Sequence, residues 1–244
     1  MILLAIDTSG AYASVAVFDG AAVLGEVTWH ARRRHDDHLF PAIERLLVLV
    51  GAELGDVRRV AVATGPGSFT GLRVGIAAAQ GIVRASGVAL VGVPTCDVVA
   101  YPFASSGRRV CVLIDAGRGE HYAAMYRTRR GVWGRTSDIR TVAIDDLVRE
   151  VVRDTIFAGD VTPAMAQALR ERLGRRAIVP SPSALVRRAG HLAEVGWARA
   201  EAGESVEPDA LEPVYIRPPT IRGPAGEIVA PAGPEPASAV RRTS

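Results

Sequence analysis

The 244-residue sequence contains no lysine, so all 29 of its basic residues are arginine. Cysteine is also scarce: Cys96 and Cys111 are the only two, and they do not form a CxxC pair. The sequence therefore predicts no disulfide framework. Aromatic residues make up only 5%, and few of them lie among the arginines. Because RNA readers typically combine a basic surface with stacking aromatics, we do not expect this chain to read an RNA sequence directly.

Long hydrophobic runs are missing as well. No apolar stretch approaches the ~18 residues that a membrane span requires. The apolar residues 1–6 reach Asp7 at once, and they are too few and too uncharged for a signal peptide. We therefore expect a cytoplasmic protein without a membrane partner. Apolar residues make up 48% of the chain, enough for a sizeable core in one large domain or two lobes.

The hydrophobic pattern predicts the same order of elements twice. Each round begins with an apolar strand that ends in an aspartate, Asp7 or Asp115, continues through two more strands, and then alternates helix with strand. Three antiparallel strands extended by parallel βα units form a mixed sheet with helices on both faces. The sequence thus predicts an α/β fold of two tandem actin-like ATPase lobes (ASKHA, RNase H-like), each a mixed five-stranded sheet flanked by helices.

The predicted lobes span residues 1–105 and 106–217, with the boundary at a serine- and glycine-containing segment. From residue 218 onward the composition changes. Residues 218–244 contain six prolines and almost no large apolar side chains. Such a segment cannot bury enough apolar surface to offset the entropy lost on ordering, so we predict a disordered proline-rich tail.

A long and unusual motif, TGPGSFTGLRVG, runs from Thr64 to Gly75. It is accompanied by IDTS at 6–9, LIDA at 113–116 and EPVYIRP at 212–218. Together these segments resemble the TsaB (YeaZ) family from residue 2 to about residue 218. The resemblance implies a non-catalytic scaffold subunit that pairs with a TsaD-like catalytic paralogue and is joined by a TsaE-like ATPase.

The same resemblance implies the reaction. The complex would transfer a threonylcarbamoyl group onto the adenosine 3′ of the anticodon, in tRNAs that read codons beginning with A. This chain would then meet tRNA indirectly, through the complex, and it could also form a homodimer. Two alternatives stay open: a stand-alone metal-dependent hydrolase, peptidase-like enzyme or ATPase, and a homodimeric regulator unconnected with tRNA. No GxSxG nucleophile motif supports peptidase chemistry.

Two predicted helices, at about 35–50 and 71–86, form the expected partner interface. The first carries bulky apolar residues and the second is rich in small ones, which would let a partner helix approach closely. Family resemblance points to the same helices. The predicted interface residues are His35, Leu39, Phe40, Ile43, Leu46, Gly71, Arg73, Gly75 and Ala78. The alternative is that both helices simply cover the protein's own sheet.

The metal-binding residues of the catalytic paralogue are not present. The resemblance implies a pair of histidines at i, i+4 in that paralogue, and here Thr95 and Val99 occupy the two positions. Valine cannot ligate a metal, and threonine would be a poor ligand. A second candidate is the run HDDH at 35–38, but acidic residues in a first helical turn are also explained by the helix dipole. We therefore predict no metal site.

A nucleotide site is predicted only in degenerate form. Glycines at a strand-to-helix turn could hold a phosphate, or they could form a tight turn that lets the helix pack closely. Without lysine, a P-loop is excluded. Asp7, Thr8 and Ser9 resemble a degenerate form of the first phosphate loop of the superfamily, in which Ser9 stands where a glycine is usual. The candidate residues are Asp7, Thr8, Ser9, Gly65, Gly67, Ser68 and Asp115. We expect no cofactor of the chain's own, with ATP or ADP at a subunit interface of the assembled complex as the alternative.

Overall fold

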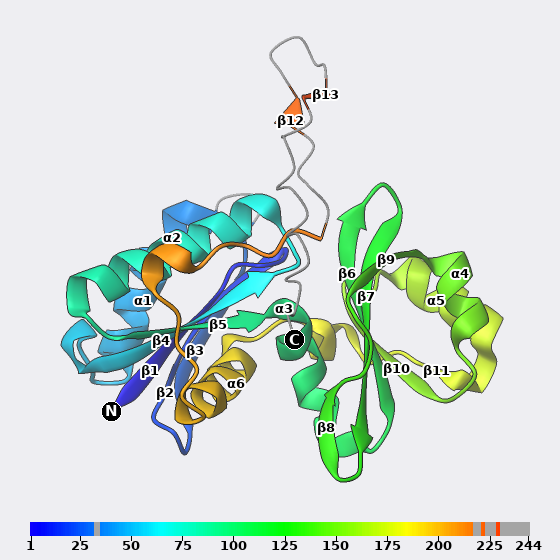
Figure 1. Cartoon of the computed structure of the whole chain (residues 1–244), viewed down its shortest axis with the longest axis horizontal. Helices are drawn as coiled ribbons and strands as arrows, with labels where there is room; N and C mark the ends of the chain where they lie inside the picture. Colours follow the sequence, from blue (N-terminus) through cyan, green and yellow to red (C-terminus); the bar gives the residue numbers. More distant parts are fainter. Residues whose placement is uncertain (32–34, 217–220, 223–227, 230–244) are drawn as a thin grey trace, which may run out of the picture.

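The structure is a computed structural model that describes residues 1–31, 35–216, 221–222 and 228–229. Two lobes lie side by side, each built on its own β-sheet (Figure 1). The two-lobed α/β fold expected from the sequence is therefore confirmed.

The first sheet has five strands in the order β3-β2-β1-β4-β5, with β1 antiparallel to β2 and parallel to β4. This is the predicted mixed sheet. The strands are β1 (Ile2–Asp7), β2 (Tyr12–Phe18), β3 (Val23–His30), β4 (Val57–Gly65) and β5 (Ala89–Pro94).

Helices cover both faces of this sheet because β1 alternates its apolar side chains. Leu4 and Ile6 pack with α1 (His35–Leu49) and α2 (Phe69–Ser86) on one face. Leu3 and Ala5 pack with α6 (Ala189–Glu201) on the other face. The two faces form separate apolar clusters, so the first lobe is a three-layer sandwich.

The second sheet has six strands rather than the predicted five. Its order is β11-β10-β6-β7-β8. Strand β9 pairs with the first half of β7, on the edge where β8 pairs with the second half. The additional strand is β9, which is only four residues long and therefore shows too little alternation to be recognised in the sequence. The strands are β6 (Arg109–Gly117), β7 (Glu120–Arg129), β8 (Val132–Arg135), β9 (Arg140–Ala143), β10 (Thr155–Gly159) and β11 (Ala177–Ile178).

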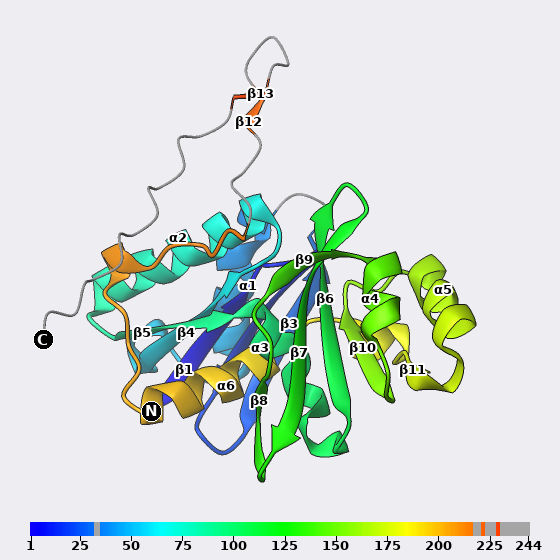
Figure 2. The same ribbon diagram turned by 45° about the vertical axis from the view of Figure 1, so that its right-hand side comes forward.

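The two faces of the second sheet are covered by different helices. Helices α4 (Ile144–Glu150) and α5 (Pro163–Leu173) pack against the outer face. Helix α3 (Thr95–Ala100) packs against the inner face through Cys96 and Val99, while its Val98 packs with the first lobe. Two views show α3 between the sheets (Figures 1 and 2), so this short helix forms part of the interface that joins the lobes.

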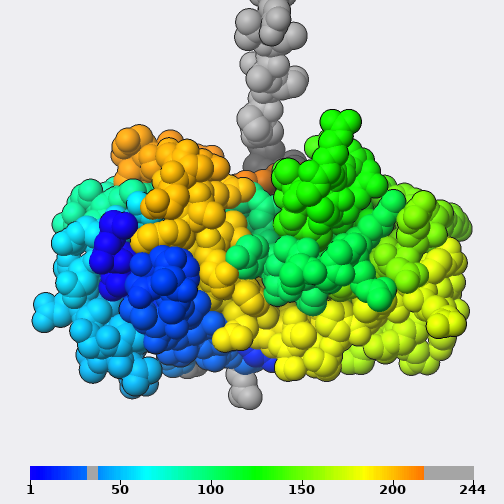
Figure 3. Space-filling model, turned by 90° about the horizontal axis from the view of Figure 1, so that it is seen from below, coloured from blue at the N-terminus to red at the C-terminus, as the bar shows by residue number. Residues whose placement is uncertain are grey.

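The chain does not stay in the second lobe up to residue 217. From Ala189 it returns to the first lobe, where α6 lies beside the N-terminal strands (Figure 3). Beyond α6, the amide of Val206 donates to the carbonyl of Leu90, and that of Val214 donates to Thr64. The physical reason is that Leu192 and Ala193 bury the face of the first sheet that α1 and α2 leave uncovered.

The predicted disordered tail lies mostly outside the described residues. Within it, β12 (Ile221–Arg222) pairs antiparallel with β13 (Ile228–Val229). The expectation of disorder for the remainder of 218–244 stays a prediction. In the described part of the chain, no helix is both long enough and apolar enough to cross a membrane.

Candidate functional site

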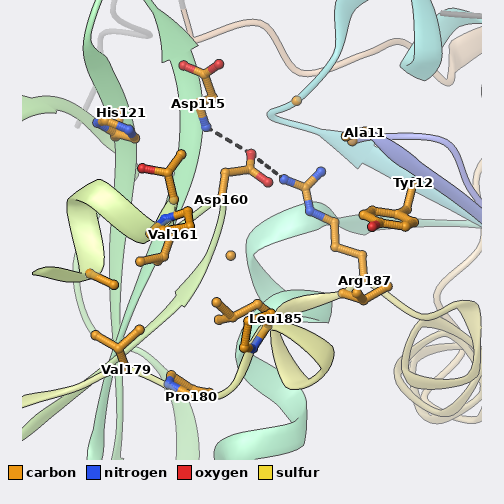
Figure 4. Close-up of a pocket in the computed structure, with 18 of the residues that line it drawn as sticks. Ala11, Tyr12, Asp115, His121, Asp160, Val161, Val179, Pro180, Leu185 and Arg187 are labelled. Atoms are coloured by element: carbon orange, nitrogen blue, oxygen red, sulfur yellow. Dashed lines mark hydrogen bonds and ion pairs between the residues drawn. The ribbon is translucent and has the colours of Figure 1, made fainter. Parts of the chain in front are cut away.

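A cavity of about 1140 Å³ lies between the lobes and is lined by both (Figure 4). The first lobe contributes the turn after β1 and the loop before α2. The second lobe contributes the ends of β6 and β10, and the segment that leads into α6. The lining residues include Ser9, Gly10, Gly67, Ser68, Asp115, Gly159, Asp160 and Arg187. The cavity therefore brings together most of the nucleotide-site residues predicted from the sequence.

Asp7 does not face this cavity freely. It is fully buried at the end of β1, and its Oδ1 accepts hydrogen bonds from the Ser9 amide at 2.9 Å and the Ser9 hydroxyl at 2.6 Å. The Ser9 side chain is itself fully buried. A glycine at position 9 would remove one hydrogen-bond donor to the Asp7 carboxylate and leave space beside it. The Ser9 side chain fills this space, which the glycine of the superfamily pattern leaves empty.

The glycine-rich loop packs directly onto this turn. The Ser68 amide donates to the Ser9 carbonyl at 2.8 Å, and the Thr8 hydroxyl donates to the Gly71 carbonyl at 2.6 Å. A Cβ atom at Gly67, Gly71 or Gly75 would come closer than 3.0 Å to Ser9 or Thr8. These glycines are therefore required for the close approach of α2 to the turn after β1.

The glycine-rich loop also has amides that donate within the protein, one at the end of β4 and one at the start of α2. The Gly71 amide donates to the Ser68 hydroxyl at 3.2 Å, and the Gly65 amide donates to the Thr95 hydroxyl at 3.1 Å. Amides that already have protein acceptors are poor candidates for holding a phosphate. The geometry fits the tight-turn interpretation of the loop and does not support a phosphate cradle.

Arg187 closes the same end of the cavity, and sequence reasoning missed it. Its Nη1 donates to the Ser9 hydroxyl at 3.1 Å, and its Nη2 pairs with Asp160 Oδ2 at 2.6 Å. That carboxylate oxygen also accepts the Asp115 amide at 3.0 Å, as Figure 4 shows. Only 5% of the Arg187 side chain is exposed. This chain of contacts joins the turn after β1 to the ends of β6 and β10, and so links the two lobes.

No sequence signal singles out Arg187. It is one of 29 arginines, it follows no motif, and 178 residues separate it from Ser9. Gly10 offers one clue, because a Cβ atom there would come closer than 3.0 Å to the Arg187 guanidinium. Only the folded structure shows which arginine needs that space.

The positions that correspond to the histidine pair are core positions here. Thr95 is fully buried and accepts the Gly65 amide, and Val99 packs in the second-lobe core. Burial raises the pKa of both Cys96 and Cys111 to about 12, so the thiols stay protonated and are poor metal ligands. No group of three His, Cys, Asp or Glu residues in the described ranges could hold a metal ion. The HDDH run at 35–38 stays untested, because the side chains of residues 35–37 are not among those that the structure describes.

The predicted partner interface divides into buried and exposed residues. The buried ones belong to the core of the first lobe, and they are Leu39, Ile43, Leu46, Gly71, Gly75 and Ala78. They cover the protein's own sheet and turn, so they cannot contact a partner in this fold. Phe40 and Arg73 are exposed on the outer faces of the two helices. The side chain of His35 lies outside the described part.

Comparisons with known proteins agree with this fold. Residues 23–184 match a family model described as TsaD, tRNA N6-adenosine threonylcarbamoyltransferase. The Escherichia coli tRNA threonylcarbamoyladenosine biosynthesis protein TsaB is 30% identical over 226 residues, which cover 89% of this chain and 95% of that protein. The structure of YeaZ from Pseudomonas aeruginosa superposes with a TM-score of 0.73 and 26% identity, covering 88% of this chain and 99% of that one.

A more distant neighbour supports the fold alone. Component A of (R)-2-hydroxyglutaryl-CoA dehydratase from Acidaminococcus fermentans superposes with a TM-score of 0.51 at 11% identity, over 84% of this chain and 100% of that one. The fold is that of the actin-like ATPases, two lobes around a cleft, and the end of this cleft beside the turn after β1 is filled by the protein's own side chains. The chain belongs to the TsaB (YeaZ) family. It has a role in tRNA threonylcarbamoyladenosine biosynthesis, and the stand-alone hydrolase or ATPase alternative is not favoured.

Proposed function

We propose that this chain is the non-catalytic subunit of a cytoplasmic complex in which a TsaD-like partner transfers the threonylcarbamoyl group onto tRNA. The contact of Arg187 with Ser9 and Asp160 carries the proposal. It occupies the end of the cleft where a phosphate would have to lie beside the turn after β1. The core positions of Thr95 and Val99 support the proposal further, because they leave no histidine pair for a catalytic metal.

A nucleotide could still bind in the assembled complex, at a place other than the cleft of this chain. We propose that any ATP or ADP binds at a subunit interface or in a TsaE-like ATPase, and not against Ser9 in this chain. A phosphate at Ser9 would have to compete with Asp160 for the Arg187 guanidinium, which already pairs with that carboxylate. The energetic cost of breaking a largely buried ion pair opposes such binding.

The purified chain is expected to show negligible ATPase and peptidase activity. Arg187 and Ser9 fill the end of the cleft where a phosphate would bind, and burial keeps both cysteine thiols protonated, so the chain offers neither a phosphate cradle at Ser9 nor a thiolate nucleophile. Release of phosphate from ATP and cleavage of a peptide substrate would be measured with the chain alone and with its partner. Turnover at roughly 1 per second or above by the chain alone, abolished in Asp115→Asn, would contradict the proposal.

The partner face is proposed to lie on the outer sides of α1 and α2. This surface carries exposed apolar side chains at Phe40, Val48 and Leu49, with 52%, 79% and 75% of their area accessible. Arg73 lies over the Phe69 ring at 4.0 Å and donates to the Tyr215 hydroxyl. Exposed apolar area of this kind is typical of protein interfaces. A homodimer through the same face would compete with the TsaD-like partner.

Adjacent alanines on α2 allow this face to be tested. Ala77 is exposed, whereas Ala78 is buried in the core of the first lobe. We expect Ala77→Glu to keep its melting temperature within about 2 °C, because surface substitutions usually change stability by less than ~0.5 kcal/mol. Capture of the TsaD-like partner should fall at least about tenfold, since an unpaired charge in an interface costs several kcal/mol.

Ala78→Glu is the matched control. It should unfold the first lobe, because it places an unpaired charge in the apolar core. Circular dichroism and partner capture would be recorded for both variants. A folded Ala77→Glu variant that captures the partner as well as the wild-type chain does would place the interface elsewhere.

A further inference from the structure

One end of the second sheet carries the turn between β7 and β8 (Figure 1). Four arginines lie in the strand ends and the loop at this end of the sheet. Arg109 begins β6, and Arg127 and Arg129 end β7. Arg153 precedes β10 by two residues. Because β10, β6 and β7 are neighbours in the sheet, these residues lie across three adjacent strands at one end. We call Arg109, Arg127, Arg129 and Arg153 the basic strip.

The strand register places the strip on one face of the sheet. Val110 pairs with Tyr126 in the antiparallel β6–β7 ladder, so Arg109 lies opposite Arg127. Side chains alternate along a strand, and Arg109 shares its face with Cys111, which packs under α4 and α5. Arg127 and Arg129 follow Met125 on this same face. The strip therefore extends the outer face of the sheet beyond the end of α4.

The strip is not neutralised within the described part of the protein. Nine other arginines there form ion pairs, including Arg108 with Asp154 and Arg140 with Glu150 beside the strip. None of the four strip arginines forms one among the described residues, and the buried Nε of Arg127 has no hydrogen-bond acceptor there. Partial desolvation lowers the pKa of Arg127, and repulsion from Arg129, Arg109 and Arg153 lowers it further.

We propose that the basic strip binds the phosphate backbone of tRNA. Like charges held together without ion-paired carboxylates of their own are stabilised by an anion that brings several negative charges in a row, which a nucleic-acid backbone does. This inference rests on the proposed function, because that function brings a tRNA to the complex. The chain would then contact tRNA directly, and not only through the other subunits of the complex as the sequence led us to expect.

Contact with phosphates, rather than with bases, follows from what surrounds the strip. The nearby aromatic pair, Tyr126 and Trp133, lies on the opposite face of the sheet, in the cluster that packs with α3. The strip thus lacks the stacking partners with which proteins read RNA bases. Binding through arginine and phosphate alone positions the RNA and is independent of its sequence.

The test uses Arg129→Gln/Arg153→Gln, because both side chains are exposed and their loss should not disturb the core. The matched control is Arg170→Gln/Arg175→Gln, which removes two exposed, unpaired arginines from another part of the same lobe. Labelled tRNA would be titrated into the chain bound to its TsaD-like partner, at salt concentrations between about 0.05 and 0.2 M. The titration would be repeated with the chain alone and with phosphatidylglycerol vesicles in place of tRNA.

The strip variant should weaken tRNA binding about tenfold and reduce the slope of log affinity against log salt by about two, one for each lost phosphate contact. The control should change neither quantity appreciably. Equal affinity and slope for wild type and strip variant would overturn the inference, as would binding of the strip to vesicles but not to tRNA. The proposed function is tested separately, by measuring whether the chain captures the TsaD-like partner. If capture fails for the wild-type chain, the titration of the chain alone still decides the role of the strip.

Discussion

Gly71→Ala is expected to destabilise the first lobe by more than about 3 kcal/mol, or to prevent folding altogether. A Cβ atom at this position would come closer than 3.0 Å to the carbonyl oxygen of Thr8. That oxygen belongs to the backbone of the turn after β1, so it cannot move aside as a flexible side chain would. Relief would require α2 to move away from the turn, which would break the hydrogen bond from the Thr8 hydroxyl to the Gly71 carbonyl.

Gly81→Ala is the matched control in the same helix. A Cβ atom at Gly81 meets nothing within 4 Å, so the substitution should stabilise the helix by up to about 1 kcal/mol. Urea denaturation followed by circular dichroism would measure both variants. A Gly71→Ala protein as stable as the wild type would show that α2 does not need its close contact with Thr8.

Arg187→Ala is expected to lower the free energy of unfolding by about 2–4 kcal/mol. Removing one partner of a buried ion pair typically costs 3–5 kcal/mol. Asp160 keeps 33% of its side chain exposed, so part of the cost is relieved by water. The contact joins the turn after β1 to β6 and β10, so its loss should also loosen the two lobes relative to each other. Hydrogen exchange of the Asp115 amide would report this directly, because that amide donates to Asp160.

Two further variants separate the ion pair from other effects. Arg187→Ala/Asp160→Asn should recover part of the lost stability, because it removes the carboxylate that Arg187→Ala leaves without its partner. Arg170→Ala, an exposed arginine of the same cavity, should change stability by less than about 0.5 kcal/mol. Equal stability of Arg187→Ala and the wild type would remove the basis for a cleft closed by its own side chains.

The sheet that forms the first lobe could be predicted because its signals are local. Each strand shows its own run of apolar residues, and the strand order follows from two hairpins and two parallel connections. The return of α6 to that sheet could not be predicted in the same way. Apolar residues such as Leu192 identify a helix with a buried face, but they do not say which of two sheets buries it.

The candidate site likewise could not be predicted in full, because the sequence does not show which segments meet in the fold. A motif of small residues at Gly71, Gly75 and Ala78 fits close packing against a partner as well as close packing within the chain. The deciding fact is the position of Thr8, which the fold places under α2 and which no spacing in the sequence reveals. Asp7 and Ser9 were found because they form a motif, whereas Arg187 and Asp160 were missed because they meet only in three dimensions.

Reconstitution of the tRNA modification would show whether this chain is a required but non-catalytic subunit. An unmodified tRNA would be incubated with threonylcarbamoyl-AMP, ATP, the TsaD-like partner and a TsaE-like ATPase, with and without this chain. Threonylcarbamoyladenosine would be measured by mass spectrometry of the digested tRNA. Modification is expected with the chain present, including an Asp115→Asn variant, and should drop to background when the chain is left out. Full modification without the chain, or none with Asp115→Asn under conditions where that variant is folded and still captures the partner, would contradict a supporting, non-catalytic role.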